Sequence, residues 1–211
     1  MTGPTFYGPD EFASDTDVSR ETLNNLKLYA SALTKWQSAK NLVANSTIDD
    51  LWRRHFLDSA QLFPLIRRYH TGADLTLLDI GSGAGFPGLV LAIMGLAHTT
   101  LVEANGRKCT FINHVIRETA ASATALNERI ESVEGHVFDV ITSRACAKVE
   151  QLLVWSKPFI GPNTEIWLLK GAMAEEELTQ AAASWSMAIE KFDSRSSEEG
   201  IILRLSDIVE R

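Results

Sequence analysis

A glycine-rich run constrains the fold of this chain more than any other feature. The run is LDIGSGAGFPG, residues 78–88. A short apolar segment typical of a buried strand precedes it, and a segment typical of a helix follows it. Glycine allows backbone conformations that other residues resist, and it lets a ligand approach the main chain closely. The order of strand, glycine turn and helix therefore predicts a binding turn for a nucleotide or nucleoside.

Two ligands fit the spacing of these glycines. Glycines at 83, 85 and 88 match the GxGxxG pattern of dinucleotide sites, where a pyrophosphate lies at a helix N-terminus. Asp79 followed by Gly81, Gly83 and Gly85 matches the acid-GxGxG pattern of S-adenosylmethionine sites. The proline of the run removes one amide from the first helical turn, which weakens a phosphate site and leaves a sulfonium site unaffected. The methyl donor is therefore favoured over the dinucleotide, and a purely structural turn is the third alternative.

Glu103 ends the next apolar run along the chain. A carboxylate at this place can accept hydrogen bonds from both ribose hydroxyls in either cofactor. The competing interpretation is an acid that is favoured near a helix N-terminus by the helix dipole. Together with the glycine turn, the ribose role is preferred.

Apolar segments alternate in length and period from residue 71 onward, which predicts strands followed by helices. Expected strands lie at 75–80, 99–103, 123–127, 137–142, 165–169, 187–192 and 201–205, and expected helices at 89–94, 107–119, 149–155 and 175–183. This alternation predicts an α/β fold with a mostly parallel sheet that helices cover on both faces. The last two strands have no long helix between them, so an antiparallel hairpin at the sheet edge is expected.

The chain divides into three predicted parts. Residues 1–17 contain two Gly-Pro dipeptides and no basic side chain. We expect this segment to be a flexible or loosely docked tail. Residues 18–70 show apolar positions at helical spacing in two runs, about 18–36 and 48–69, and form a predicted helical extension. Residues 71–211 form the α/β domain, which we expect to make one compact unit with the extension.

Composition excludes several other classes of protein. No stretch approaches the roughly 18 uninterrupted apolar residues that a membrane helix needs, and no secretory signal is visible. The two cysteines, Cys109 and Cys146, lack the spacing of a disulfide framework or zinc site, which fits a reducing cytoplasm. The net charge of −7 argues at first sight against nucleic acid. Residues 20–70, however, carry eight basic and four acidic side chains, so the extension is locally basic.

Several runs of residues in this sequence together match one known family. The chain resembles the RsmG (GidB) family of bacterial 16S rRNA guanine-N7 methyltransferases. The matching runs, over about two thirds of the chain, are Lys35-Trp36, Asn41-Leu42, RRHFLDS at 53–59, the whole 79–88 turn, Val102-Glu103, Arg107-Lys108, SRA at 143–145 and LKG at 169–171. The first 17 residues do not match, and Val43 stands where the family often has threonine.

The resemblance implies a Rossmann-like class I methyltransferase that uses S-adenosylmethionine, with a seven-stranded sheet and an N-terminal helical extension. It implies methyl transfer to N7 of the guanine at position 527 of 16S rRNA in the small ribosomal subunit. Residues carried over as contacts of the methyl donor are Gly81, Phe86, Ile130, Glu131 and Arg144. Without the family, Ile130 is an ordinary core residue and Glu131 a solvated acid. Arg144, by contrast, closes an apolar strand where α/β ligands bind.

This chemistry explains why no catalytic triad or dyad is visible. Guanine N7 has a free lone pair and no proton to remove, so orientation of the two reactants can supply the catalysis. No catalytic base is expected, and Arg144 is the one candidate for orienting the reactants. A competing chemistry, cytosine C5 methylation, would use Cys146 as nucleophile, but a small packing residue is the preferred interpretation.

His55 and Asp58 lie three residues apart on one helical face. A metal would need further ligands, and no second cluster is visible, so no metal is expected. We expect instead that Arg54, His55 and Asp58 form a polar network between the extension and the sheet domain.

The expected partner is 16S rRNA or the small subunit, with no membrane and no obligate protein partner, and the chain is expected to act as a cytoplasmic monomer. Phosphate contacts come chiefly from Lys and Arg. The candidates are Lys35, Lys40, Arg53, Arg54, Arg107 and Lys148. A small-molecule methyltransferase and a nucleotide-binding regulatory module are the two remaining alternatives.

Overall fold

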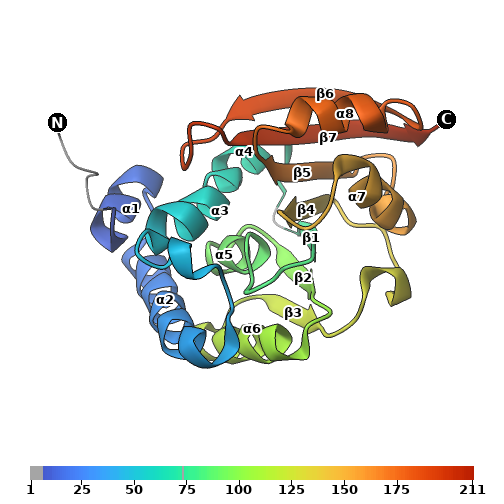
Figure 1. Ribbon diagram of the computed structural model, residues 1–211. Coiled ribbons are helices and arrows are strands. Elements are labelled where there is room, and N and C mark those ends of the chain that lie inside the picture. Colours follow the sequence, from blue (N-terminus) through green and yellow to red (C-terminus); the bar gives the residue numbers. More distant parts are fainter. Residues whose placement is uncertain (1–6, 73) are drawn as a thin grey trace.

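A twisted sheet runs through the middle of the molecule with helices on both faces (Figure 1). The computed structural model describes residues 7–72 and 74–211. The strand order is β3-β2-β1-β4-β5-β7-β6. The strands are β1 (Thr76–Ile80), β2 (His98–Val102), β3 (Ala123–Leu126), β4 (Val140–Arg144), β5 (Glu165–Lys170), β6 (Trp185–Asp193) and β7 (Ile201–Glu210).

The pairing of the strands confirms the predicted topology. The first five strands pair in parallel, while β7 pairs antiparallel with both β5 and β6. The final hairpin therefore closes one edge of the sheet. Because the strand order reverses beside β1, the carboxyl ends of β1, β2 and β4 meet at the point where ligands bind in open α/β sheets.

The helices are α1 (Pro9–Thr16), α2 (Arg20–Lys40), α3 (Asp58–Ala60), α4 (Leu62–Tyr69), α5 (Gly88–Ile93), α6 (Gly106–Thr119), α7 (Val149–Ser156) and α8 (Ala174–Ala181). Short 3₁₀ turns occupy Asn45–Thr47, Ile130–Ser132 and Lys157–Phe159, and a π-helical turn occupies Trp52–Leu57. Over the residues that the structure describes, no helix has both the length and the apolar character needed to cross a membrane.

Alternating side chains of the strands pack into two separate layers. Leu77 of β1 lies in the core beneath α4 and α5, whereas its neighbour Leu78 lies in the core beneath α7 and α8. Both leucines are fully buried. The period of two along a strand sends neighbours to opposite faces. A sheet covered on both faces therefore reads in the sequence as a continuous apolar run.

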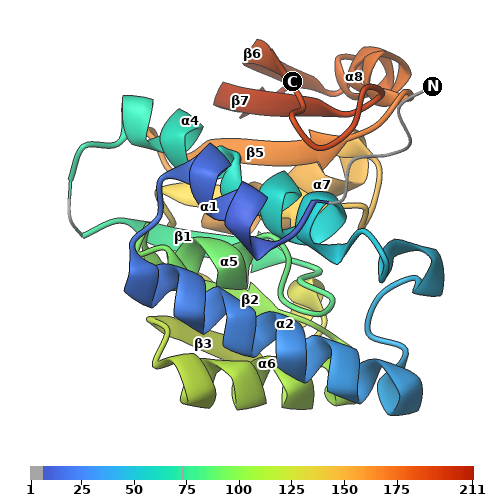
Figure 2. The same ribbon diagram turned by 90° about the vertical axis from the view of Figure 1, so that its left-hand side faces the viewer.

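The helical extension shares its core with the α/β domain. Helix α2 begins at the Ser19 cap, whose hydroxyl accepts from the Thr22 amide, and lies alongside α6 (Figure 2). Tyr29 and Leu33 on its inner face are fully buried together with Phe111 of α6. Removing the extension would therefore expose the apolar side of α6.

The N-terminal segment differs from the expected tail. Residues 9–16 form α1, and its first turn is closed by the Glu11 carboxylate, which accepts from the Gly8 amide. Phe12 is fully buried, with its ring centroid 5.3 Å from that of Trp52. The expectation of a flexible segment is thus wrong over residues 7–17, because Phe12 docks the helix and Tyr7, just before it, is buried as well. Residues 1–6 of that prediction lie outside the described residues.

The second predicted helical run, 48–69, is also interrupted. The π-helical turn at 52–57 leads into α3, and Gln61 separates α3 from α4. Strand β4 begins later than expected and extends to Arg144, while β6 and β7 are longer than their apolar cores indicated. Polar residues continue these two strands because β6 is the outermost strand, whose side chains after Trp185 are all exposed or partly buried.

The docking of α1 can be tested by truncating its one buried side chain. Phe12→Ala should lower the free energy of unfolding by about 3–5 kcal/mol, because a fully buried phenylalanine loses its contacts. Leu28→Ala on α2 is the control, since Leu28 is half exposed. Urea denaturation of both variants measures the difference. Equal stability of the two variants would show that α1 does not dock.

Candidate functional site

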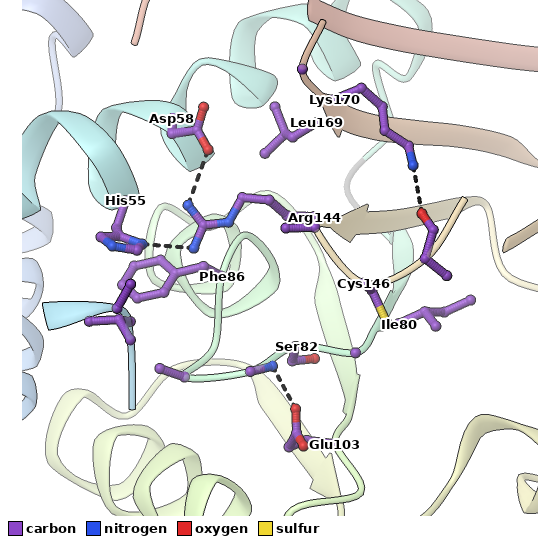
Figure 3. Close-up of a pocket in the computed structure, with 18 of the residues that line it drawn as sticks. His55, Asp58, Ile80, Ser82, Phe86, Glu103, Arg144, Cys146, Leu169 and Lys170 are labelled. Carbon is purple, nitrogen blue, oxygen red and sulfur yellow. Dashed lines mark hydrogen bonds and ion pairs between the residues drawn. The ribbon is translucent and has the colours of Figure 1, made fainter. Parts of the chain in front are cut away.

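A cavity of about 1120 Å³ opens at the carboxyl ends of β1, β2, β4 and β5. Its walls come from the glycine turn, from the ends of the neighbouring strands, from the extension and from the β6–β7 loop. The wall segments lie within 42–47, 54–58, 80–86, 102–108, 128–131, 144–148, 169–177 and 194–201. Segments distant in the sequence thus converge on one space (Figure 3).

Asp79 lies beneath the glycine turn and does not line the cavity. Its carboxylate is fully buried, accepts from the Thr142 hydroxyl at 2.8 Å and accepts from the Gly88 amide at 3.3 Å. Burial raises the pKa of Asp79 to about 6. A Cβ at position 88 would lie 2.6 Å from the Asp79 Cβ, so only glycine fits there. Asp79 therefore supports the turn from below, and the expected direct contact with a cofactor does not follow from its position.

The amides at the start of α5 are already used within the protein. The Phe86 amide donates to the Ser82 carbonyl, Gly88 to Asp79, and Leu89 to the Gly85 carbonyl. Pro87 has no amide hydrogen to donate. A pyrophosphate at this helix N-terminus would need free N–H groups. The geometry therefore favours a ligand without phosphate at the turn.

Glu103 holds the turn from the side of β2. One carboxylate oxygen accepts from the Gly83 amide at 2.8 Å (Figure 3). The other accepts from the Asn105 amide at 2.7 Å. Each oxygen keeps a further lone pair, and the residue lines the cavity, so ribose hydroxyls can still bind there. Buried Ile130 and exposed Glu131 line the cavity as well. Gly81, Gly83 and Phe86 complete this group of cavity-lining residues.

Arg144 points from the end of β4 toward the extension (Figure 3). Its guanidinium donates to the Asp58 carboxylate at 3.1 Å and to the Arg54 carbonyl at 3.0 Å, and it contacts His55 Nδ1 at 2.8 Å. It also lies 5.1 Å from the centroid of the Phe86 ring. The expected polar network therefore exists, but Arg54 enters it through its main-chain carbonyl and Arg144 supplies the cation.

Asp58 connects this network to the β6–β7 loop. Its second oxygen accepts from the Ser196 hydroxyl at 2.6 Å and from the Gln61 amide at 3.1 Å. Gln61 in turn accepts from the Arg195 main-chain amide. The carboxylate thus joins three walls of the cavity. The spacing of His55 and Asp58 indicated a polar network, but no pattern in the sequence indicated that the β6–β7 loop would reach it.

The two cysteines occupy different environments. Cys109 is buried in α6, as expected for a packing residue. Cys146 lines the cavity, and its sulfur leaves no room for a side chain at Gly81. Burial raises the pKa of the Cys146 thiol, which disfavours the thiolate that a nucleophile requires. Among the described residues, no group of three or more His, Cys, Asp and Glu side chains is placed to hold a metal ion.

The expected phosphate contacts separate into two groups. Arg54 and Lys148 line the cavity. Lys35, Lys40, Arg53 and Arg107 do not. The Arg53 guanidinium lies 4.5 Å from the centroid of the Tyr7 ring and 3.8 Å from the Asp50 carboxylate.

Three further cations in the cavity wall, Lys108, Arg129 and Lys170, were not predicted as site residues, although Lys108 and Lys170 lie in the family-like runs. The Lys170 ammonium donates to the Glu177 carboxylate at 2.7 Å and to the Ala147 carbonyl at 2.6 Å. Lys170 is therefore neutralised within the wall. A lysine after an apolar strand was the one signal that could have placed it there.

The buried carboxylate predicts a specific pH dependence. The pKa of Asp79 is raised from 3.8 to about 6 in the folded protein, so folding favours the protonated form. Its contribution to stability is present below about pH 4 and is lost as the pH rises through 6. Asp79→Asn removes this contribution, so the stability of the wild type relative to the variant should fall between pH 4 and 6. Urea denaturation across this range measures the difference, and a constant difference would contradict the assignment.

Comparison with known proteins agrees with this geometry. Residues 22–200 match the GidB family model, described as rRNA small subunit methyltransferase G. The ribosomal RNA small subunit methyltransferase G of Paramagnetospirillum magneticum is 47% identical over 201 residues, covering 95% of this chain and 96% of that protein. The protein of the same name from Rhodospirillum centenum is 45% identical and covers 100% of this chain and 95% of its own.

Solved structures share the fold at low sequence identity. A variant of MtNAS in complex with S-adenosylmethionine has a TM-score of 0.58 at 14% identity, covering 96% of this chain and 85% of its own. A TehB-like SAM-dependent methyltransferase from Corynebacterium glutamicum has a TM-score of 0.55 at 13% identity, covering 86% and 98%. From the family match and from relatives of nearly full length, the chain belongs to the rRNA small subunit methyltransferase G (GidB) family.

Proposed function

We propose that this protein transfers a methyl group from S-adenosylmethionine to N7 of a guanine in 16S rRNA of the small ribosomal subunit. The observation that carries the proposal is the glycine turn, whose helix N-terminus offers no free amide to a phosphate while its cavity side is open. Family membership supports the rRNA substrate, because the relatives are named for methylation of the small-subunit RNA.

The residues around the turn fit the methyl donor. The Glu103 carboxylate is placed to bind the ribose hydroxyls, and Ile130 with Val102 offers an apolar surface for the adenine. The acidic Glu131 stands beside that surface. Bound here, the donor supplies an electrophilic methyl group on a sulfonium. The carboxylates of Glu103 and Glu131 in this wall suit a cationic ligand.

The acceptor needs positioning rather than a base. Guanine N7 attacks through its own lone pair, and the product ring is cationic, so a strong base would add nothing. Holding the two reactants in line can supply about 7–11 kcal/mol of the barrier reduction. The hydrogen bonds that join Arg144 and Ser196 to Asp58 hold parts of the cavity wall together, which supports such alignment.

The acceptor RNA would approach across the extension. Arg54 and Lys148 border the cavity and lie in the wall that the extension and the β4–α7 segment form. We place the activity in the cytoplasm, where the small ribosomal subunit is available to a bacterial enzyme.

Methylation of small subunits tests the proposed function. Subunits from a strain that lacks this enzyme, incubated with the protein and radioactive S-adenosylmethionine, should incorporate label that digestion recovers as 7-methylguanosine. Subunits from the parent strain are the control and should accept little label, because their site is already modified.

Titration calorimetry separates the alternatives. The protein should bind S-adenosylhomocysteine. If the protein binds NAD(H) and does not bind S-adenosylhomocysteine, the proposal is contradicted and a nucleotide-binding module is favoured. If the protein binds S-adenosylhomocysteine but no methyl label enters the RNA, a small-molecule methyltransferase is the remaining alternative.

The two neighbouring arginines should differ in their effect on RNA binding. Arg54→Ala should weaken the binding of a 16S rRNA fragment and reduce the salt dependence of affinity by about one counterion, since its exposed side chain borders the cavity. Arg53→Ala is the matched control, because Arg53 is already held by Tyr7 and Asp50. Filter binding over a series of salt concentrations measures both slopes. A larger change for Arg53→Ala would place the RNA surface on the outer side of the extension.

A further inference from the structure

The Arg144 side chain is held by three acceptors that all come from the extension. A guanidinium carries five N–H groups and accepts nothing. Two of its N–H groups go to the Arg54 carbonyl and the Asp58 carboxylate, and a third goes to His55 Nδ1. Two N–H groups remain without a partner among the described residues and are available to a ligand in the cavity. The direction of these two N–H groups depends on how firmly the other three N–H groups hold the guanidinium through their hydrogen bonds.

The contact with Arg144 fixes the tautomer of His55. Because Arg144 only donates, the Nδ1 atom at 2.8 Å must present its lone pair, and the imidazole proton lies on Nε2. That Nε2–H donates to the Thr47 hydroxyl at 2.7 Å. The Thr47 hydroxyl then donates to the Ala44 carbonyl at 2.7 Å. The hydrogen bonds therefore run in one direction from Arg144 to the 42–47 segment.

This chain of hydrogen bonds joins two walls of the cavity. Arg144 closes β4, whereas residues 42–44 and 47 lie on the far side of His55, and both groups line the same space. Thr47 ends a 3₁₀ turn of only three residues, so few main-chain bonds hold it. Gln37 of α2 also holds this segment, through hydrogen bonds to Leu42, Val43 and Asn45. The imidazole is the hydrogen-bonded link from this wall to Arg144.

The surroundings keep the imidazole able to accept. His55 is 7% exposed, and burial together with the positive charges of Arg144 and Arg54 lowers its pKa to about 3. The groups facing its ring atoms are Arg144, the Thr47 hydroxyl and the Phe86 ring, whose centroid lies 5.0 Å away. The lone pair on Nδ1 is therefore retained through the neutral and mildly acidic range.

We propose that His55 is a positioning residue, whose neutral imidazole orients Arg144 and, through Thr47, the 42–47 wall for binding of the methyl donor. The inference rests on the proposed function, since it assigns the donor to this cavity. His55 itself touches no reacting atom in this role. A packing role, by contrast, would need only the flat ring against Phe86.

Substitutions at position 55 distinguish positioning from packing. His55→Phe keeps the ring and loses both hydrogen bonds. His55→Asn loses the ring but can place an amide oxygen near the Nδ1 position, where it accepts from Arg144. Positioning predicts that S-adenosylhomocysteine binds about tenfold or more weakly to His55→Phe, with His55→Asn retaining more affinity. Packing predicts the opposite order.

Controls separate this result from loss of the fold. His114→Phe makes the same chemical change at a histidine that stacks on Trp36 away from the cavity, and it should leave donor affinity unchanged. Thr47→Val removes only the outer hydroxyl and should weaken S-adenosylhomocysteine binding severalfold while thermal unfolding stays close to the wild type. If His55→Phe does not fold, Thr47→Val still tests the proposal.

The measurements are titration calorimetry with S-adenosylhomocysteine and steady-state methylation of small subunits. For His55→Asn, the KM for the donor should rise while kcat at saturating donor stays near the wild-type value. Wild-type affinity in Thr47→Val, or tighter binding by His55→Phe than by His55→Asn, would overturn the inference. Failure of the wild type to bind S-adenosylhomocysteine would instead overturn the proposed function.

Discussion

The buried Asp79 carboxylate is the constraint on which the geometry of the site depends. A charge taken out of water costs several kcal/mol unless hydrogen bonds compensate, and here the Thr142 hydroxyl and the Gly88 amide provide them. To reach that amide, the chain must pass so close that position 88 has no room for a Cβ. The shape of the turn thus follows from the need to satisfy one carboxylate.

The same carboxylate decides which ligands the turn can take. A helix N-terminus attracts anions through its free amides and its dipole. In this protein the anion at the start of α5 is Asp79, a permanent part of the fold. A phosphate would have to compete with it and would be repelled by its charge. The glycine at position 88 therefore makes room for the Asp79 side chain and not for a phosphate.

The helical extension belongs to the site as much as the sheet does. The Tyr29 hydroxyl of α2 donates to the Ala84 carbonyl within the glycine turn, and its ring stacks on Phe86 at 5.1 Å. Burial raises the pKa of Tyr29, so this donor keeps its proton. On the opposite side, Asp58 binds Arg144. The turn and the strand end are consequently held by side chains from residues 20–60, and the cavity would lose its shape without them.

Local sequence patterns predicted most of the fold, because each helix or strand carries its own pattern of apolar residues or glycines. Continuous apolar runs predicted the strands, and the glycines predicted the turn at the end of β1. The docking of α1 was missed because it depends on one phenylalanine in a polar segment, and such a contact leaves no periodic signal. The β6–β7 loop was missed for a related reason. Its serines are ordinary loop residues until the fold brings them to Asp58.

Side-chain roles were harder to predict than positions, since a role depends on direction. Asp79 stands in the expected place but faces inward, away from the cavity. Arg54 lies in the expected network but joins it through its carbonyl, which leaves its cationic side chain exposed. A sequence pattern gives the residue and its neighbours. Whether a side chain supports the wall or faces the ligand is settled by the contacts of other segments.

The net charge of the whole chain and the charge close to the cavity are different properties. Each phosphate contact adds affinity through counterion release whatever the RNA sequence, so a strongly basic surface would bind RNA indiscriminately. This chain has a net charge of −7, and several of its cations, including Lys170 and Arg144, are neutralised by carboxylates within the fold. Arg54, Lys108, Arg129 and Lys148 remain in the cavity wall, where they can attract phosphate. The cations at the cavity wall, rather than the net charge of the chain, therefore determine how this part of the molecule attracts a phosphate.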